Sequence, residues 1–464
     1  DNGVDLGSSS YEFKDLYVDG VAYVDGLDLN GTTVSATATE LNLIDGVTAT
    51  TAELNIMDGV TATATELNLL DGVTSLAISV TGLSDGLVED NSMYIGNDPS
   101  SSTSTAQHNV AIGVTSLDAV TTGDDNVGIG YDALTANTSG SYNTAVGMSA
   151  LRYSTTASHN TGVGYNSLSD NTSGTANTGL GSRSLVLNTQ GSNNTAVGKE
   201  ALKVNTTGSR NIAVGTGALD APDTENDNLA IGYDALGGSI AGGELNVAIG
   251  NYSLDANTSG DNNVAVGYNS LTGNTEGINN TAVGNSALAS NTTANKNVAV
   301  GHLALTANTT GYANTSSGTE SLIANTTGSY NVSVGYEALK SNTTGDNNIG
   351  IGRAGDLITT GSDNITIGQD ADPSANSASN QIVIGSGATG HGDNITVIGN
   401  GSATAIHPHD DGEVDLGSSS YEFKDLYVDG VAYVDGLDLN GTTVSATAAE
   451  LNIMDGVTSS AAEL

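Results

Sequence analysis

The chain has 464 residues with 61 glycines, no cysteine or tryptophan and only two phenylalanines, so it lacks the large side chains that fill ordinary globular cores. Ten lysines and arginines oppose 52 aspartates and glutamates, and the net charge of −42 argues against binding to phosphate backbones or anionic membrane surfaces. No apolar run has membrane-spanning length and no signal peptide is visible. Hydrophobic residues still make up 37% of the chain and recur at regular positions, which predicts a repeat protein whose units stabilise one another.

The first element in chain order is a segment that occurs twice. The sequence VDLGSSSYEFKDLYVDGVAYVDGLDLNGTTVSATA occupies residues 4–38 and returns unchanged at 414–448, an offset of 414 − 4 = 410 residues. We expect strand-rich shaft segments over residues 1–36 and, after a junction, over 401–446. One unit followed by the start of the next predicts a larger tandem array.

A 13-residue repeat and a linker make up the segment 37–90, and the repeat begins again in 447–464. The sequences ELNLIDGVT, ELNIMDGVT and ELNLLDGVT start at Glu40, Glu53 and Glu66, and each glutamate follows a threonine three residues earlier. This spacing is typical of a capping box, and the Asp-Gly pair that follows is a helix stop. We predict a short capped helix in each repeat, which must pack on other copies because it is too short to persist alone.

The longest element, over residues 91–400, is a 17-residue repeat marked by the glycine that closes each Ala-Val-Gly triplet. The spacing is regular except for one extra residue before Gly250 and shorter steps near the end. We call these residues the anchor glycines: Gly96, Gly113, Gly130, Gly147, Gly164, Gly181, Gly198, Gly215, Gly232, Gly250, Gly267, Gly284, Gly301, Gly318, Gly335, Gly352, Gly368, Gly385 and Gly399.

Each 17-residue unit reads as a strand, a corner, a short apolar segment and a turn. In the unit around Gly198, we expect Val197 and Leu202 to fill the interior and Asn194 to form a ladder with its equivalents. The Asn-Thr-Thr-Gly run that begins at Asn205 has turn chemistry. The pattern predicts an all-β solenoid, or β-roll, whose 19 coils at about 4.8 Å each would form a rod of about 90 Å.

Two resemblances follow from these motifs. NTAVGMSAL, NNVAVGYNSL and NVSVGYEAL are similar to the head repeats of trimeric autotransporter adhesins, which implies a parallel β-roll in a homotrimer, although the repeats of that family are usually shorter than these. The flanking VDLGSSSYEFKDLYVDG and ATAAELNIMDGVT resemble long tail-fibre proteins of tailed phages that infect marine cyanobacteria. That resemblance implies an intertwined trimeric shaft.

The sequence shows no catalytic set and no cofactor-binding motif. The Gly-Ile-Gly at Gly128 lacks the strand-turn-helix context of a phosphate loop, and the threonines lie in turns rather than in the flat Thr-x-Thr arrays of ice-binding proteins. His407 and His409 lie two apart, and in a trimer six imidazoles on the axis could hold a divalent metal ion. Phage fibres show similar axial sites. The alternative is an exposed hinge between roll and shaft, and we read His108, His159, His302 and His391 as surface residues.

We predict a non-enzymatic, extracellular fibre protein that associates with itself as a homotrimer. The leading hypothesis is a segment of a virion tail fibre that presents surfaces for a host glycan or protein. The alternative is a bacterial extracellular filament or surface adhesin built from tandem copies of the unit that begins to repeat at residue 414. A glycan depolymerase would need a carboxylate pair that breaks the repeat, and the sequence pattern shows none. We expect the coil at Gly198 to contact a partner through the residues that differ from one unit to the next, which are Lys199, Glu200, Lys203 and Arg210.

Overall fold

The computed structural model describes residues 104–403 except 222–223 and 239–242, residues 86–96 except 90, and parts of 10–34 and 406–445. Its contacts divide the chain into two units, Asp1–Ile78 and Ser79–Leu464. Within the first unit, β1 (Leu27–Leu29) and β2 (Thr32–Val34) form an antiparallel hairpin. The 13-residue repeats with their predicted helices lie outside the described residues, as do His407 and His409.

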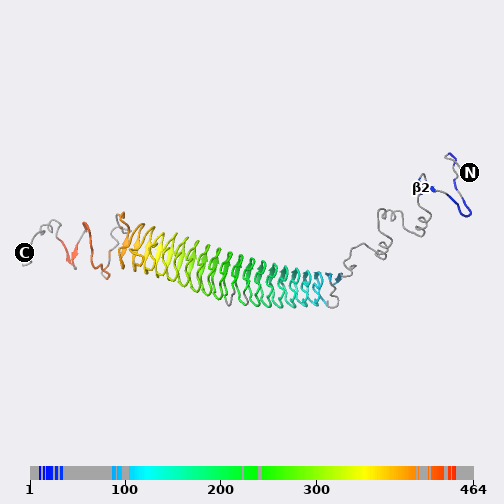
Figure 1. The fold of residues 1–464 in the computed structure, drawn as a ribbon, viewed down its shortest axis with the longest axis horizontal. Coiled ribbons are helices and arrows are strands. Elements are labelled where there is room, and N and C mark those ends of the chain that lie inside the picture. Colours follow the sequence, from blue (N-terminus) through cyan, green and yellow to red (C-terminus); the bar gives the residue numbers. More distant parts are fainter. Residues whose placement is uncertain are drawn as a thin grey trace, which may run out of the picture. The chain divides into compact units, whose positions relative to one another are not determined.

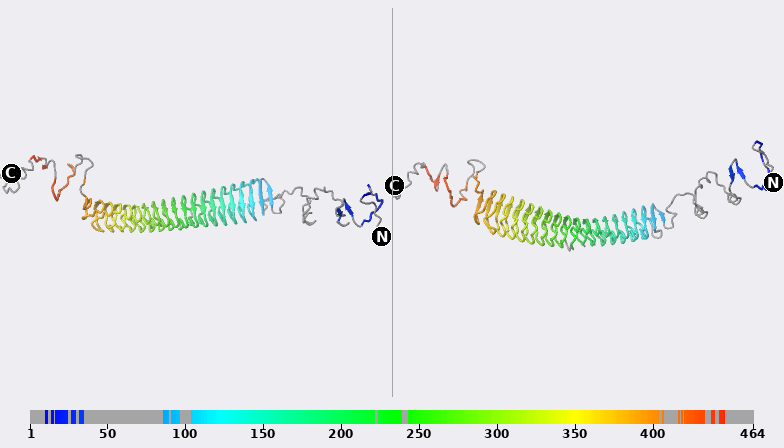
Figure 2. Two further views of the ribbon diagram at one scale, coloured as in Figure 1. Left: turned by 90° about the horizontal axis from the view of Figure 1, so that it is seen from above. Right: turned by 45° about the horizontal axis from the view of Figure 1, so that its top comes forward.

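The second unit contains one long ladder of short strands. β3 (Gly86–Glu89) pairs antiparallel with β4 (Ser92–Ile95), and every later strand of the ladder pairs parallel with the one before it. Figures 1 and 2 show the coils stacked in sequence order, with the first coils in cyan and the last in orange at opposite ends of the stack. The ladder is therefore an open solenoid and not a closed barrel, and the predicted all-β solenoid is confirmed.

The parallel strands that follow β4 are β5 (Val110–Ile112), β6 (Val127–Ile129), β7 (Thr144–Val146), β8 (Thr161–Val163), β9 (Thr178–Leu180), β10 (Thr195–Val197), β11 (Ile212–Val214), β12 (Leu229–Ile231), β13 (Val247–Ile249), β14 (Val264–Val266), β15 (Thr281–Val283), β16 (Val298–Val300), β17 (Thr315–Ser317), β18 (Val332–Val334), β19 (Ile349–Ile351), β20 (Ile365–Ile367), β21 (Ile382–Ile384) and β22 (Thr396–Ile398). A second small hairpin joins β23 (Asp438–Leu439) to β24 (Thr442–Thr443). Among the described residues, none belongs to a helix that could cross a bilayer.

From Leu117 to Leu339, the interior of each coil is filled by one leucine and by the small middle residue of the strand. Leu202 and Ala196 are fully buried, whereas Val197 is only partly buried. The prediction for Leu202 is confirmed, and the one for Val197 is wrong. Alternation along a strand sends the first and third residues outward, and the inward residue must be small because the leucine faces it.

Larger inward strand residues occur in coils that lack the interior leucine. The leucine column ends at Leu339, and the inward residues of the last regular strands are then larger, Thr366 in β20 and Val383 in β21. At the other end of the ladder the inward residue of β4 is Tyr94, which is fully buried. Larger inward residues therefore occur near both ends of an interior whose other strands, β5 to β19, place alanine, glycine or serine inward.

The anchor glycines are needed for two separate reasons. Gly198 has a φ of +132°, a conformation that side chains rarely adopt. A Cβ on it would also collide with the carbonyl oxygen of Gly215 in the next coil. The same clash recurs from Gly113 to Gly335, so the glycine column is where the backbones of successive coils approach most closely.

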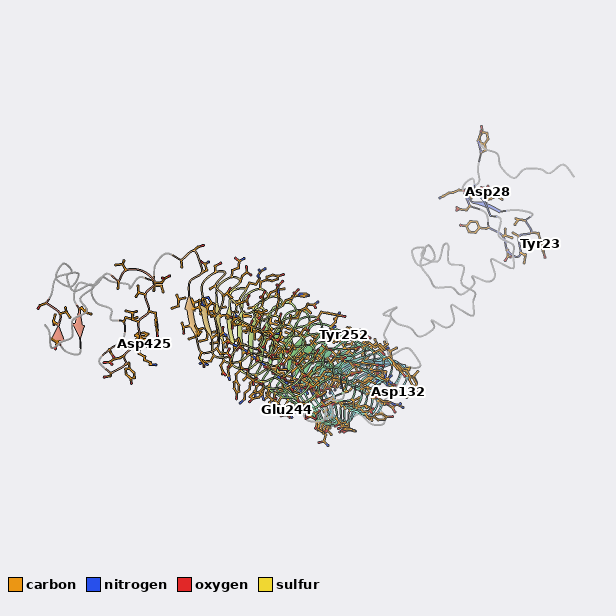
Figure 3. All side chains as sticks on the ribbon, turned by 60° about the vertical axis from the view of Figure 1, so that its left-hand side comes forward. Tyr23, Asp28, Asp132, Glu244, Tyr252 and Asp425 are labelled. Atoms are coloured by element: carbon orange, nitrogen blue, oxygen red, sulfur yellow. The ribbon has the colours of Figure 1, made fainter. Side chains whose placement is uncertain are left out.

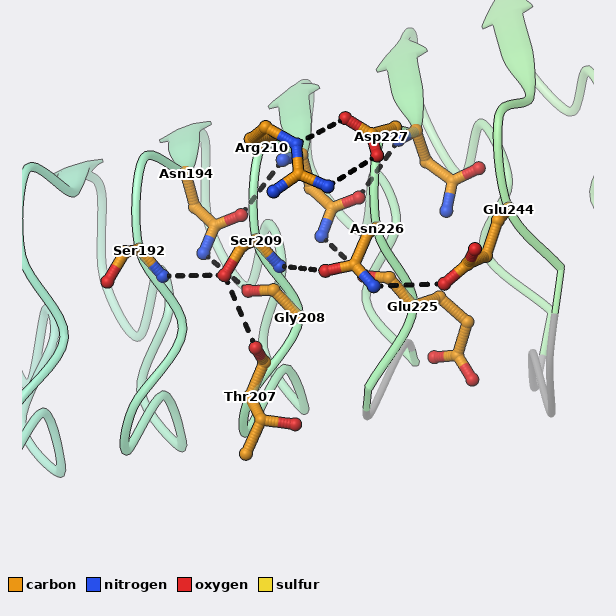
Figure 4. A network of polar contacts seen from close by, with 12 residues as sticks. Ser192, Asn194, Thr207, Gly208, Ser209, Arg210, Glu225, Asn226, Asp227 and Glu244 are labelled. Carbon is orange, nitrogen blue, oxygen red and sulfur yellow. Dashed lines mark hydrogen bonds and ion pairs between the residues drawn. The ribbon is translucent and has the colours of Figure 1, made fainter.

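The asparagine before each strand forms the predicted ladder. The backbone N–H of Asn211 donates to Oδ1 of Asn194 at 2.9 Å, and Nδ2 of Asn194 donates to the carbonyl of Gly208 at 2.7 Å (Figure 4). Asn194 is itself fully buried, as are its equivalents from Asn109 to Asn364. Each amide thus satisfies one backbone group of its neighbouring coil and one of the adjacent turn.

A second asparagine ladder runs through the Asn-Thr-Thr-Gly corners. Nδ2 of Asn205 donates to Oδ1 of Asn188 at 2.6 Å and to the carbonyl of Gly208 at 3.0 Å. Within a run, each Nδ2 after the first donates to the Oδ1 of the preceding corner asparagine, so the Oδ1 of the last one has no partner among the described atoms. Asn137, Asn205 and Asn342 are the three such residues within the described part of the chain. The corner asparagine is absent from the coil after each of them.

Ser154 occupies the corner position between Asn137 and Asn171, and its buried hydroxyl also lacks a partner among the described atoms. We predict that Ser154→Asn joins these two ladder segments and raises the free energy of unfolding by about 1–2 kcal/mol, since the orphaned Oδ1 of Asn137 gains a donor and the unpartnered hydroxyl is removed. The space is adequate, because Asn291 fits the same position before Ala294 just as Ser154 precedes Ala157. Denaturant-induced unfolding followed by circular dichroism measures the change.

Ser173→Asn is the matched control, because Ser173 is an exposed corner residue whose replacement should change stability by less than about 0.5 kcal/mol. A Ser154→Asn variant no more stable than this control would contradict the ladder interpretation.

Candidate functional surfaces

The outward side of the parallel ladder is apolar and uncovered in the single chain. We call the outer sheet face the first and third residues of β5 to β22, which are valine, isoleucine, leucine or threonine at all positions but Ser317. Val298 and Val300 are 38% and 40% exposed. Other apolar members with comparable exposure are Ile112, Leu180, Ile212, Ile231, Val283, Val334, Ile351 and Ile398.

The size of the outer sheet face sets it apart from scattered surface residues. Eighteen strands about 4.8 Å apart, each about 10 Å long, give an area of about 850 Å². Monomeric proteins rarely expose a continuous apolar patch above a few hundred Å², and a standard protein interface covers about 800 Å² on each partner. The face therefore has the extent of a complete protein interface.

Five of the ten lysines and arginines form ion pairs with a carboxylate of a neighbouring coil: Arg152, Arg183, Arg210, Lys340 and Arg353. Glu200 accepts from Arg183 at 3.1 Å and from Lys203 at 3.3 Å. Arg210 forms a bidentate ion pair with Asp227 in the next coil, in which Nε and Nη2 donate to the two carboxylate oxygens at 2.6 Å each (Figure 4). Of the variable residues singled out from the sequence in this coil, three thus serve contacts within the chain, and only Lys199 lies exposed outside these pairs.

Three tyrosines form a cluster at the coils anchored by Gly232, Gly250 and Gly267. We call Tyr233, Tyr252 and Tyr268 the tyrosine cluster. The ring centroids of Tyr233 and Tyr252 lie 5.4 Å apart at 75°, and those of Tyr252 and Tyr268 lie 6.1 Å apart at 86°. By contrast, the rings of Tyr142 and His159 stack in parallel at 4.9 Å and 9°.

Two groups of carboxylates have raised pKa values. Burial, and then the charge of Asp234, raises the pKa of Asp220 and of Asp255, and Asp234 directly follows Tyr233 of the tyrosine cluster. Just after the shortened coil that ends at Gly368, burial raises the pKa of Asp372 to about 6, and the charge of Asp356 adds to the rise. The Leu357 N–H donates to the Asp372 carboxylate at 3.2 Å, and this hydrogen bond opposes the rise in its pKa. One member of each group lies in a coil of irregular length, Asp234 between Gly232 and Gly250 and Asp356 between Gly352 and Gly368.

The histidines and the turn asparagines fall as follows. His108, His159, His302 and His391 are exposed, as predicted. Within the described part of the chain, no three acidic or histidine side chains come close enough to hold a metal ion. Asn205 and its equivalents in the Asn-x-Thr sequons are fully buried, so the folded solenoid cannot present them for glycosylation.

Sequence reasoning missed the tyrosine cluster and both carboxylate groups. The repeat predicts the position of each residue along the coil, but it does not predict which side chains of neighbouring coils contact each other. The available signal was the irregular spacing at Gly232–Gly250 and Gly352–Gly368, because each group includes or adjoins a residue of one of these coils. Comparison with protein-family models and with characterised proteins gives no match, so fold and chemistry carry the functional argument.

We predict that Asp372→Asn stabilises the solenoid at pH 7 by about 1 kcal/mol after allowance for its partial exposure. A raised pKa means that the folded state binds the proton more tightly, so stability is lost as pH rises from about 4 through about 6. The difference between variant and wild type should be near zero at pH 4 and full at pH 7. Denaturant unfolding across this range measures it.

Asp356→Asn supplies the control, because removing the neighbouring charge should move the Asp372 transition to lower pH without abolishing it. A pH-independent gain from Asp372→Asn would contradict the assignment.

Proposed function

We propose that this chain is a non-enzymatic segment of an extracellular fibre, and that copies of it associate through the outer sheet face. The observation that carries the proposal is the uncovered apolar face along the whole ladder. The interior of each coil is narrow and holds mainly alanine and leucine, so each chain buries little apolar surface by itself. Association would cover the remaining apolar side chains.

Three copies around a common axis is the arrangement that we favour. Each copy would place its outer sheet face toward the axis, and the charged and polar corners would stay in water. The head repeats of trimeric autotransporter adhesins, which the 17-residue units resemble, imply this stoichiometry. The charge of −42 on each chain is compatible with it only if the acidic side chains remain outside.

A virion tail fibre is the leading role, in which the solenoid spaces and presents surfaces that contact a host glycan or protein. The resemblance of the flanks to cyanophage fibres supports it. A bacterial filament or adhesin of tandem units is the second candidate, supported by the exact return of residues 4–38 at 414–448. Immunogold electron microscopy of whole cultures, with antibodies to the solenoid, separates the two: label on virion tails supports the first, and label on free filaments the second.

We predict that the double change Val283→Asp and Val300→Asp converts the assembly to monomers. The two side chains are 36% and 40% exposed in the single chain, so the monomer tolerates the charges, whereas an interface would bury them unpaired. Sedimentation velocity should show a shift from about three times the chain mass of 46.2 kDa to the chain mass itself.

The control is Thr207→Asp, an exposed corner residue whose change should leave the assembly intact. Wild-type protein that sediments as a monomer at micromolar concentration would overturn self-association through this face.

A further inference from the structure

The tyrosine cluster has a geometry that the regular repeat does not produce. Tyr233 and Tyr268 directly follow their anchor glycines, whereas Tyr252 stands one residue later, after Asn251. The Tyr233 N–H donates to Oδ1 of Asn251 at 2.9 Å, and the Tyr252 N–H donates to the Tyr233 carbonyl at 3.0 Å. These bonds hold Tyr252 between its neighbours on a rigid backbone, so little conformational entropy would be lost when a ligand binds.

The rings stand nearly perpendicular to one another and remain accessible. Tyr233 is 46% exposed and Tyr268 is 49% exposed. Figure 3 shows Tyr252 at one edge of the solenoid and Glu244 at the other. In a parallel stack, as in Tyr142 and His159, each ring covers the face of the next. Perpendicular rings instead leave two faces that meet at an angle, which is the arrangement of aromatic sites for alkylated cations.

Asp234 places negative charge beside the ring of Tyr233. Asp234 raises the pKa of Tyr233, first by its charge and then by a hydrogen bond. Its carboxylate lies over Gly217 in the preceding coil, where a Cβ would collide with it. Among the described residues, no lysine or arginine forms an ion pair with Asp220, Asp234 or Asp255. The local field thus favours a positively charged ligand.

We infer that the tyrosine cluster binds a quaternary ammonium group, such as the trimethylammonium of a small choline-type compound, against its ring faces. The neighbouring carboxylates supply the attraction at longer range, and the rings supply the selectivity for alkylated nitrogen. A bare metal ion does not suit the site, because no three acidic side chains in the described residues lie close enough to hold one. A protein partner does not suit it either, since three coils span only about 10 Å along the stack.

This site is independent of the proposed self-association. Its rings and carboxylates lie on the segments that follow the strands, and the outer sheet face consists of residues within the strands. A monomeric Val283→Asp and Val300→Asp protein should therefore bind the ammonium group as wild type does. Failure of either idea leaves the other intact.

The test uses choline chloride as the probe and the full chain as the protein. Saturation-transfer NMR on the choline N-methyl protons should show saturable binding, and ammonium chloride at equal ionic strength should compete at least tenfold more weakly. Tyr252→Ala should weaken binding about tenfold, and Tyr252→Phe should keep it, since the ring is retained. Tyr233→Ala and Tyr268→Ala, which alter more exposed rings, should each weaken it several-fold.

The matched controls are Tyr142→Ala and Tyr312→Ala. Tyr142 belongs to a parallel stack, and Tyr312 forms a perpendicular pair with Tyr330, at 4.9 Å and 72°, which differs from the cluster in having two rings and not three. Neither change should alter choline binding. Equal competition by ammonium and choline would show attraction by charge alone and would overturn the proposal, as would wild-type affinity in Tyr252→Ala.

Discussion

Every coil must pair its polar backbone groups inside an interior only one leucine wide, and the buried asparagine amides meet this constraint. Asn194 and Asn205 stand at two corners of one coil, and each bonds both to a neighbouring coil and to the turn at Gly208. An unpaired buried backbone group costs about as much as a lost hydrogen bond. The asparagine columns therefore permit a narrow solenoid, and the leucine and alanine columns then fill what space is left.

The sequence predicted the solenoid, the Asn194 ladder and the buried Leu202 because the 17-residue period makes equivalent residues lie on top of one another. The prediction that Val197 fills the interior was wrong. A repeat period shows which residues lie on the same face of the strand, but it does not show which face points into the coil. The Asn205 column was expected as a turn and proved also to be a ladder. The tyrosine cluster could not be foreseen, because ring orientation depends on backbone bonds such as that between Tyr233 and Asn251.

The two surfaces proposed for function differ in how they depend on the repeat. The outer sheet face needs regularity, because one apolar residue in each coil has to fall in line with the next over the whole ladder. The tyrosine cluster needs irregularity, because it depends on Tyr252 standing one residue out of step. A repeat protein can thus keep its shape by conforming to the pattern and acquire selective contacts by departing from it.

The asparagine runs also give the solenoid a direction. Within a run, the Nδ2 of each corner asparagine donates to the preceding coil, and its Oδ1 accepts from the following coil. The last asparagine of a run, such as Asn205, therefore has an Oδ1 that is free to accept a hydrogen bond among the described atoms. During synthesis from the N-terminus, every folded coil therefore presents hydrogen-bond acceptors on which the next coil can form. Whole coils can then be added or removed in evolution without disturbing the rest, and the reach of the protein changes in fixed steps of about 4.8 Å.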